Sequence, residues 1–165
     1  MPRKINTEMH INPEHISPCG LYCGVCGIYQ ATQNNDLRFL KIILRKYQSI
    51  IPGTENFTEE DLFCDGCHSE RRSFTCNSCA IRECSQKNEY SGCHECSKFP
   101  CEAINNFPIS TRKKVILRAI PYRQKHGTEK WIAEEEIRYI CPSCNEKLFR
   151  GVTQCKKCKS KLNLD

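Results

Sequence analysis

The chain has 165 residues, with 25 Lys and Arg against 19 Asp and Glu, and it contains 15 cysteines. No stretch reaches the ~18 consecutive apolar residues of a membrane span, and the N-terminus lacks an apolar run like a signal-peptide core. These features argue against a membrane protein and against a secreted disulfide scaffold. We expect a soluble, cytoplasmic protein whose thiols stay reduced and bind metal.

Charge is unevenly distributed along the chain. Residues 1–109 carry 11 basic and 13 acidic side chains, a net charge of −2, whereas residues 110–165 carry 14 and 6, a net charge of +8. The basic third is therefore the candidate for contact with an acidic partner. The alternative is a solvated helix face followed by the Lys-rich loops that are common in zinc ribbons.

The N-terminal part begins with a polar segment, residues 1–17, which is expected to be a flexible leader. The stretch 23–33 is expected to form a short helix. After it, Asn35 or Asp36 can cap a longer helix that reaches residue 51. The apolar residues of that helix recur at helical spacing and are expected to face the core: Leu37, Leu40, Ile43, Leu44 and Tyr47.

Cysteine-rich loops are expected to follow. Thr58, with acidic residues after it, has the pattern of an N-cap, so one helical turn should lead into Cys64. Between cysteines 64 and 101 there are few Leu, Ile, Val and Phe residues, so metal must replace the missing core. The segments 76–84 and 93–101 share a C-x2-C-x4-C pattern, displaced by 17 residues.

A basic helical linker is expected over residues 109–138. Ser110 can cap its first helix, in which Pro121 should force a kink or a stop. Thr128 can cap a second helix after Gly127.

The strongest single motif is at the C-terminus, over residues 139–165. Two C-x2-C pairs lie ten residues apart, with a predicted hairpin between them in which Gly151 can supply the turn. This spacing predicts a four-cysteine zinc ribbon with a structural zinc ion, because protein thiolates fill every coordination position. Its ligands would be Cys141, Cys144, Cys155 and Cys158.

The remaining eleven cysteines do not divide by four. Grouping by proximity in the sequence gives two closed sets and one set of three thiolates. The fourth ligand of the triplet would be a histidine, solvent or substrate. The proposed sets are Cys64, Cys67, Cys76 and Cys79; Cys84, Cys93, Cys96 and Cys101; and the triplet Cys19, Cys23 and Cys26, with His10, His15, His68 or His94 as the candidate fourth ligand.

Two cysteine motifs are known from other cofactors. The triplet has the C-x3-C-x2-C spacing of radical S-adenosylmethionine enzymes, but the chain lacks the alternating strand and helix pattern of their barrel, and Val25 stands where they usually carry an aromatic residue. Cys64 to His68 matches the C-x-x-C-H of covalent haem attachment. That ligation is normally installed outside the cytoplasm, so a zinc knuckle is the preferred interpretation.

Four motifs taken together resemble a known family. CGLYCGVCGIYQATQNN at 19–35, FCDGC at 63–67, CNSCAIREC at 76–84 and CHECSKFPC at 93–101 are similar in order and spacing to domain-of-unknown-function 3795, over about residues 17–107. The resemblance implies a small cysteine-rich cytoplasmic domain, over residues 18–108, with metal sites and no established activity.

The predicted fold class is a small, cysteine-rich, metal-stapled domain, mainly α with irregular knuckle loops, plus a C-terminal β zinc ribbon. The preferred function is a non-enzymatic module that binds several Zn²⁺ ions and contacts protein or nucleic acid. The alternative is a redox protein or enzyme with an iron–sulfur cluster or an open metal at Cys19, Cys23 and Cys26. Phosphate contacts on the basic helix would come from Arg112, Lys113, Lys114 and Arg118.

Overall fold

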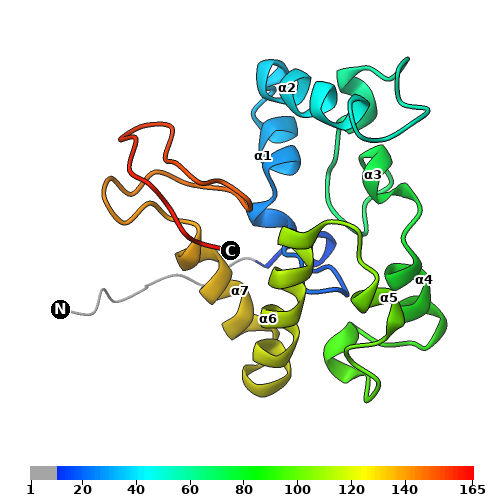
Figure 1. Ribbon diagram of the computed structural model, residues 1–165. Coiled ribbons are helices and arrows are strands. Elements are labelled where there is room, and N and C mark those ends of the chain that lie inside the picture. Colours follow the sequence, from blue (N-terminus) through cyan, green and yellow to red (C-terminus); the bar gives the residue numbers. More distant parts are fainter. Residues whose placement is uncertain (1–10) are drawn as a thin grey trace.

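The computed structural model describes residues 11–165 and is mainly helical (Figure 1). Short 3₁₀ helices (η) and irregular loops connect the α helices. In chain order the elements are η1 (Pro13–His15), η2 (Cys23–Val25), α1 (Gly27–Gln33), α2 (Leu37–Gln48), η3 (Glu59–Leu62), α3 (Phe74–Asn77), α4 (Ala80–Lys87), η4 (Cys93–Glu95), α5 (Glu102–Asn105), α6 (Ser110–His126) and α7 (Thr128–Arg138).

Helix α2 begins where its cap was predicted. The Asp36 side chain accepts a hydrogen bond from the backbone N–H of Phe39 at 3.0 Å, which satisfies one of the free donors of the first turn. Leu40 and Leu44 are buried, whereas Leu37 is 47% exposed at the first position. The apolar face is therefore shorter than the sequence indicates. The helix also ends earlier than expected, at residue 48.

Thr58 is an N-cap, as predicted. The backbone N–H of Thr58 donates to the Asp61 carboxylate at 2.8 Å, and the Thr58 side chain caps the same turn in return. This capping box fixes the single turn η3, whose Leu62 is fully buried against α1 and α2. The turn delivers the chain to Cys64, the first cysteine of the following loop.

Three small apolar clusters take the place of one large core. The first lies between η2, α6, α7 and the C-terminal segment and includes Trp131 and Tyr139. The second joins α1, α2 and η3 around Leu40. The third joins α4, α5 and α6 and includes Ile104 and Ile116. Small separate clusters stabilise a chain of this length weakly, so further cross-links are needed.

Cysteines belong to each of these clusters. Cys141 and Cys155 lie in the first, Cys64 in the second and Cys19 in the third. The thiols that are candidate metal ligands are therefore also packing residues. A metal bound by them would connect the clusters directly.

Helix α6 continues through Pro121 to His126, so the predicted stop is wrong. A proline within a helix leaves the carbonyl of the residue four positions earlier without its usual partner. Here that residue is Leu117, which is 37% exposed. Water can donate a hydrogen bond to the free Leu117 carbonyl, and the helix tolerates the ring of Pro121 because this residue is exposed.

Helices α6 and α7 pack side by side (Figure 1). Gly127 joins them with φ of 83°, a conformation that favours glycine. The Arg123 guanidinium lies 5.0 Å from the centre of the Trp131 ring.

Arg118 pairs with Glu135 at 2.5 Å, and the Glu135 side chain is fully buried. The pair links the two helices at a point shielded from water.

The predicted C-terminal β ribbon is not formed as a sheet. Within the described part of the chain this segment has two isolated antiparallel bridges, Ile140 with Lys147 and Gln154 with Lys161, and no strand. Its backbone groups are used instead to close tight turns around the cysteines, which leaves too few residues for a ladder. The segment lies beside α7, in orange and red in Figure 1.

Residues 1–10 of the predicted leader lie outside the described residues. Residues 11–17 lie against the body of the protein: Ile16 packs on the first apolar cluster, and its carbonyl is 3.1 Å from Nε2 of His68. None of the helices found between residues 11 and 165 has the length and hydropathy that crossing a membrane requires.

We predict that Arg118→Ala lowers the free energy of unfolding by about 2–3 kcal/mol. Removing one member of a buried pair costs ~3–5 kcal/mol because it leaves a charge without its partner, and the 30% exposure of Arg118 reduces that cost. The check is urea unfolding followed by circular dichroism at fixed metal content. Lys114→Ala, at an exposed position on the same helix, should change stability by less than ~0.5 kcal/mol. Equal losses of stability in the two variants would contradict a stabilising ion pair between Arg118 and Glu135.

Candidate metal centres

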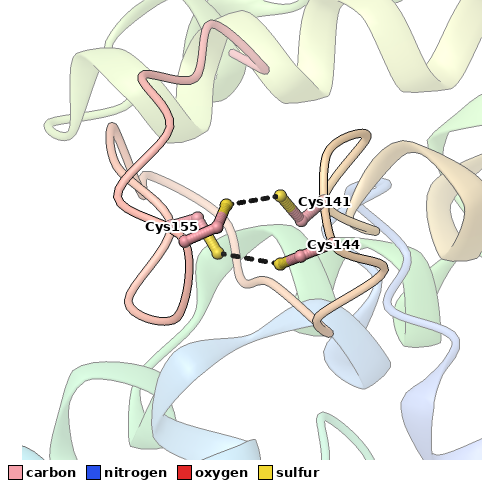
Figure 2. A group of neighbouring side chains, drawn as sticks. Cys141, Cys144 and Cys155 are labelled. Atoms are coloured by element: carbon pink, nitrogen blue, oxygen red, sulfur yellow. Dashed lines mark hydrogen bonds between the residues drawn. The ribbon is translucent and has the colours of Figure 1, made fainter.

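Four C-terminal cysteines converge on one point. The ligand atoms of Cys141, Cys144, Cys155 and Cys158 all lie within 4.8 Å of one another. The Cys141 and Cys158 sulfurs are 3.6 Å apart, and the Cys144 and Cys155 sulfurs are 3.7 Å apart. Figure 2 shows the sulfurs of the two halves facing each other across the site. Four thiolates 2.3 Å from one zinc ion would be about 3.8 Å apart, so the spacing fits a single tetrahedral metal ion.

The two halves of this site are equivalent turns. The N–H of Cys141 donates to the carbonyl of Glu146 at 2.9 Å, and the N–H of Cys155 donates to the carbonyl of Ser160 at 3.0 Å. Each second cysteine is followed by a residue with positive φ, Asn145 at 60° and Lys159 at 63°. Each turn thus presents two sulfurs on the same side.

The hydrogen bonds of the second turn favour thiolate. The Ser160 side chain, 3.1 Å from the Cys158 sulfur, lowers the pKa of that thiol to about 6. Backbone hydrogen bonding at Cys158 lowers the pKa of Cys155 as well. A thiolate that forms near neutral pH binds metal without first losing a tightly held proton.

The N-terminal cysteines have a different arrangement. A cavity of about 800 Å³ lies between α1, α3, α4 and the start of α6. Seven of the eleven N-terminal cysteines line it: Cys19, Cys23, Cys26, Cys64, Cys67, Cys76 and Cys79.

Helix starts and tight turns position these side chains. Cys26 precedes α1 and Cys79 precedes α4, while Cys76 lies within α3. Gly66, in the turn between two of the cavity cysteines, has φ of 130°, and a Cβ there would meet the Glu14 carbonyl oxygen at 2.7 Å. The turn therefore requires glycine, both for its conformation and for the close approach of the N-terminal segment.

The cavity thiols do not meet at one point as the C-terminal ones do. Among residues 11–165, the C-terminal set is the one group of three or more Cys, His, Asp or Glu residues whose ligand atoms all lie within 4.8 Å of one another. Both the predicted triplet (Cys19, Cys23 and Cys26) and the predicted set of Cys64, Cys67, Cys76 and Cys79 contribute to the cavity wall. Their assignment to separate metal ions therefore remains a prediction.

Burial keeps several of these groups protonated in the absence of metal. It raises the pKa of Cys67 to about 12 and that of Cys76 to about 11. It also raises the pKa of Cys23 well above its ordinary value, and the nearby thiols of Cys26, Cys67 and Cys64 raise it further. A metal must displace these protons, so binding should strengthen as the pH rises.

The other four N-terminal cysteines are Cys84, Cys93, Cys96 and Cys101. Burial raises the pKa of Cys93 to about 12, and the neighbouring thiols of Cys19, Cys101, Cys96 and Cys84 act in the same direction. Cys93 is therefore near the other three, of which Cys84 lies in α4 and Cys96 and Cys101 flank η4 and α5. That they share one metal ion remains a prediction.

Three of the four histidines named as candidate fourth ligands are described by the structure, and other contacts engage them. His15 packs against Tyr29 with ring centres 4.5 Å apart. His68 bonds the backbone at Ile16, and His94 lies 3.9 Å from the Glu95 carboxylate. These three histidines are not among the residues that line the cavity. His10 lies outside the described residues.

Three arginines also line the cavity, a position that the sequence did not predict for them. Arg82 is 6% exposed and donates to the carbonyls of Cys76 at 2.9 Å and Asn77 at 2.8 Å. Arg112 donates to the Tyr47 hydroxyl at 3.1 Å, and Arg150 donates to the Tyr22 carbonyl at 2.7 Å. A single arginine outside a recognisable motif gives no sequence signal that it lines a cavity. The one signal was Arg82, which lies within the CNSCAIREC motif.

The predicted phosphate-binding residues have different environments on α6. Lys114 is exposed and Lys113 is half-buried beside the Asn105 carbonyl. Arg118 pairs with Glu135, and Arg112 faces the cavity. Their role in binding nucleic acid remains a prediction, and only Lys114 among them is exposed.

Comparison with family models identifies residues 15–106 with one family, described as "Protein of unknown function (DUF3795)". The match covers more than half of the chain and confirms the family resemblance inferred for residues 17–107. Helices α6 and α7 and the four-cysteine segment follow the matched region. The searches of curated proteins and of solved structures found no match. The chain, whose N-terminal part is helical and contains the cysteine-lined cavity, therefore belongs to the DUF3795 family.

Proposed function

We propose that the chain is a non-enzymatic metal-binding module whose C-terminal zinc ion secures a basic surface for contact with an anionic macromolecule. The observation that supports this proposal is the set of four C-terminal thiolates at single-ion spacing. With four protein ligands, a zinc ion there has no open position for a substrate, so its role is structural. The thiols require a reducing environment, which favours the cytoplasm.

The zinc would stabilise the first apolar cluster as well as the turns. Cys141 and Cys155 are fully buried in that cluster beside Trp131 and Tyr139. The segment also bonds to the family domain, since the Arg150 N–H donates to the Val25 carbonyl at 2.9 Å and the Gln30 side chain donates to the Leu148 carbonyl at 3.0 Å. Zinc binding would therefore couple the C-terminal turns to α1 and η2.

The surface of the C-terminal third supports contact with a polyanion. Four of its six acidic residues are in ion pairs with basic side chains, so their charge is already neutralised locally. Exposed lysines then dominate the remaining surface. They are Lys114, Lys125, Lys130, Lys159 and Lys161.

Selectivity for base sequence should be small. The aromatic residues of this third are buried or half-buried, as Trp131, Tyr139 and Phe149 show, and so are not free to stack on bases. Nucleic acid is the polyanion that this surface fits by charge. An acidic protein surface is the alternative partner, and a binding experiment with nucleic acid distinguishes the two.

We predict that Cys155→Ser lowers the zinc content of the full-length protein by one ion per chain. A hydroxyl is a poorer zinc ligand than a thiolate, and the affected site is closed by protein ligands only. Metal analysis after anaerobic purification measures the loss. Lys157→Ala, at an exposed position in the same turn, is the matched control and should retain the ion. An unchanged zinc content in Cys155→Ser would contradict the site.

We predict salt-dependent, weakly selective binding to nucleic acid. Replacing both Lys159 and Lys161 with Ala should weaken binding and reduce the slope of log K against log salt by about 2, because each phosphate contact releases counterions. Fluorescence anisotropy with two unrelated duplexes provides the measurement.

The matched control is Lys87→Ala with Lys98→Ala, which removes the same charge from exposed positions of the family domain and should leave the slope unchanged. Equal effects of the two pairs would contradict a C-terminal binding surface. Complete absence of binding at low salt would exclude nucleic acid and leave the acidic protein partner.

A further inference from the structure

The molecule contains two kinds of cysteine site, and the contrast between them indicates different metal chemistry. At the C-terminus the sulfurs are 3.6 and 3.7 Å apart, as neighbours on one ion must be. Around the cavity, seven cysteines from three separate segments surround a volume of about 800 Å³. The cavity thiols are thus arranged around a space larger than one metal ion occupies.

This spacing argues against a set of zinc ions sharing thiolates. Each zinc ion in such a cluster still has four sulfurs at tetrahedral distance, so groups of three or four sulfurs would be closely spaced. Within residues 11–165, no cavity cysteines form such a group. In a [4Fe–4S] cluster each cysteine binds a different iron and inorganic sulfide fills the interior, so the cysteine sulfurs are farther apart.

The cavity wall carries positive charge that lacks a carboxylate partner. The guanidinium groups of Arg82, Arg112 and Arg150 donate to carbonyl and hydroxyl oxygens, and Arg82 also lies within hydrogen-bond reach of the Cys67 thiol. For these three groups, no Asp or Glu oxygen of the described chain lies within 4.0 Å. A buried cation without a counter-charge costs several kcal/mol, so the cavity favours an anionic occupant. An iron–sulfur cluster with its thiolate ligands is anionic.

Apolar side chains complete the wall. Ile28 and Ile81 are buried, and Phe74 and Phe107 are half-buried where they face the cavity. An apolar shell limits the access of water to a metal cluster and influences its reduction potential. The arrangement of thiols, arginines and apolar side chains thus has the parts that an iron–sulfur site needs.

We propose that the cavity lined by these seven cysteines binds a [4Fe–4S] cluster, with Arg82, Arg112 and Arg150 as its counter-charge. Four cysteines complete the coordination of one such cluster. Three cysteines then remain on the same wall. This metal site is separate from the zinc site at the C-terminus and adds electron transfer to the binding function proposed above.

The first test is metal and sulfide analysis of the full-length protein, purified anaerobically and reconstituted with ferrous iron and sulfide. We expect at least four iron and four sulfide per chain after desalting, a broad visible absorption, and zinc retained at the C-terminal site. A colourless protein that contains zinc and no iron or sulfide after this treatment would overturn the proposal.

Two cysteine variants separate loss of the cluster from loss of the fold. Four substitutions in the cavity wall leave three cysteines there, fewer than one cluster needs, so this variant should lose iron and sulfide while the C-terminal zinc is retained; the substitutions are Cys64→Ser, Cys67→Ser, Cys76→Ser and Cys79→Ser. Cys158→Ser, in the C-terminal site, should lose zinc while iron, sulfide and visible absorption are retained. Iron loss from both variants, or from Cys158→Ser alone, would contradict two separate sites.

An arginine variant tests the counter-charge without touching a ligand. Arg112→Gln should keep the iron content and lower the reduction potential, because a positive charge nearby stabilises the cluster after it accepts one electron. Dithionite supplies that electron in a titration with redox mediators. Arg38→Gln, at an exposed position on α2, removes the same charge away from the cavity and should leave the potential unchanged. Equal potentials for the two variants would overturn the role of Arg112.

Discussion

The distribution of cysteine thiols among the apolar clusters is the constraint on which the rest of this structure depends. The apolar side chains form three small clusters, and each cluster includes cysteines that are candidate metal ligands, such as Cys19, Cys64 and Cys141. A bound metal brings these cysteines together with a free energy that can reach ~10 kcal/mol or more per site, which small clusters cannot supply. Metal binding and folding are therefore expected to be one process in this protein.

Charge has opposite roles inside and outside the molecule. Inside, Arg82 and Arg112 face a wall of thiols, where an anionic metal cluster would remove the cost of burying their charge. Outside, the C-terminal third keeps its lysines exposed while most of its acidic residues are in ion pairs. Arg118 shows why sequence position alone does not separate these roles, since its pairing with Glu135 is a helix-to-helix contact. The same basic helix thus contributes to the cavity, the packing and the surface.

Local signals predicted some helix starts and failed at others, because α6 and α7 begin at Ser110 and Thr128 themselves, with Ile109 and Gly127 as their N-caps. The caps at Asp36 and Thr58 were predicted because a side chain satisfies the backbone of its own turn. The stop at Pro121 was wrong, since the helix continues to His126, and Leu117, whose carbonyl loses its usual partner, is 37% exposed. The predicted β ribbon is not supported as a sheet, because the described backbone of this segment forms two cysteine turns and two isolated bridges.

The sequence by itself determined the family, the abundance of thiols and the four C-terminal cysteines that meet at one point, because a C-x-x-C turn is a local geometry and two such turns at this distance meet naturally. The cavity was decided by tertiary structure. Cys23 and Cys76 are 53 positions apart in the sequence, and only the packing of α1, α3, α4 and α6 places them on one wall with Arg150. Spacing along the chain constrains ligands within one turn, whereas the distances between turns depend on how the helices pack.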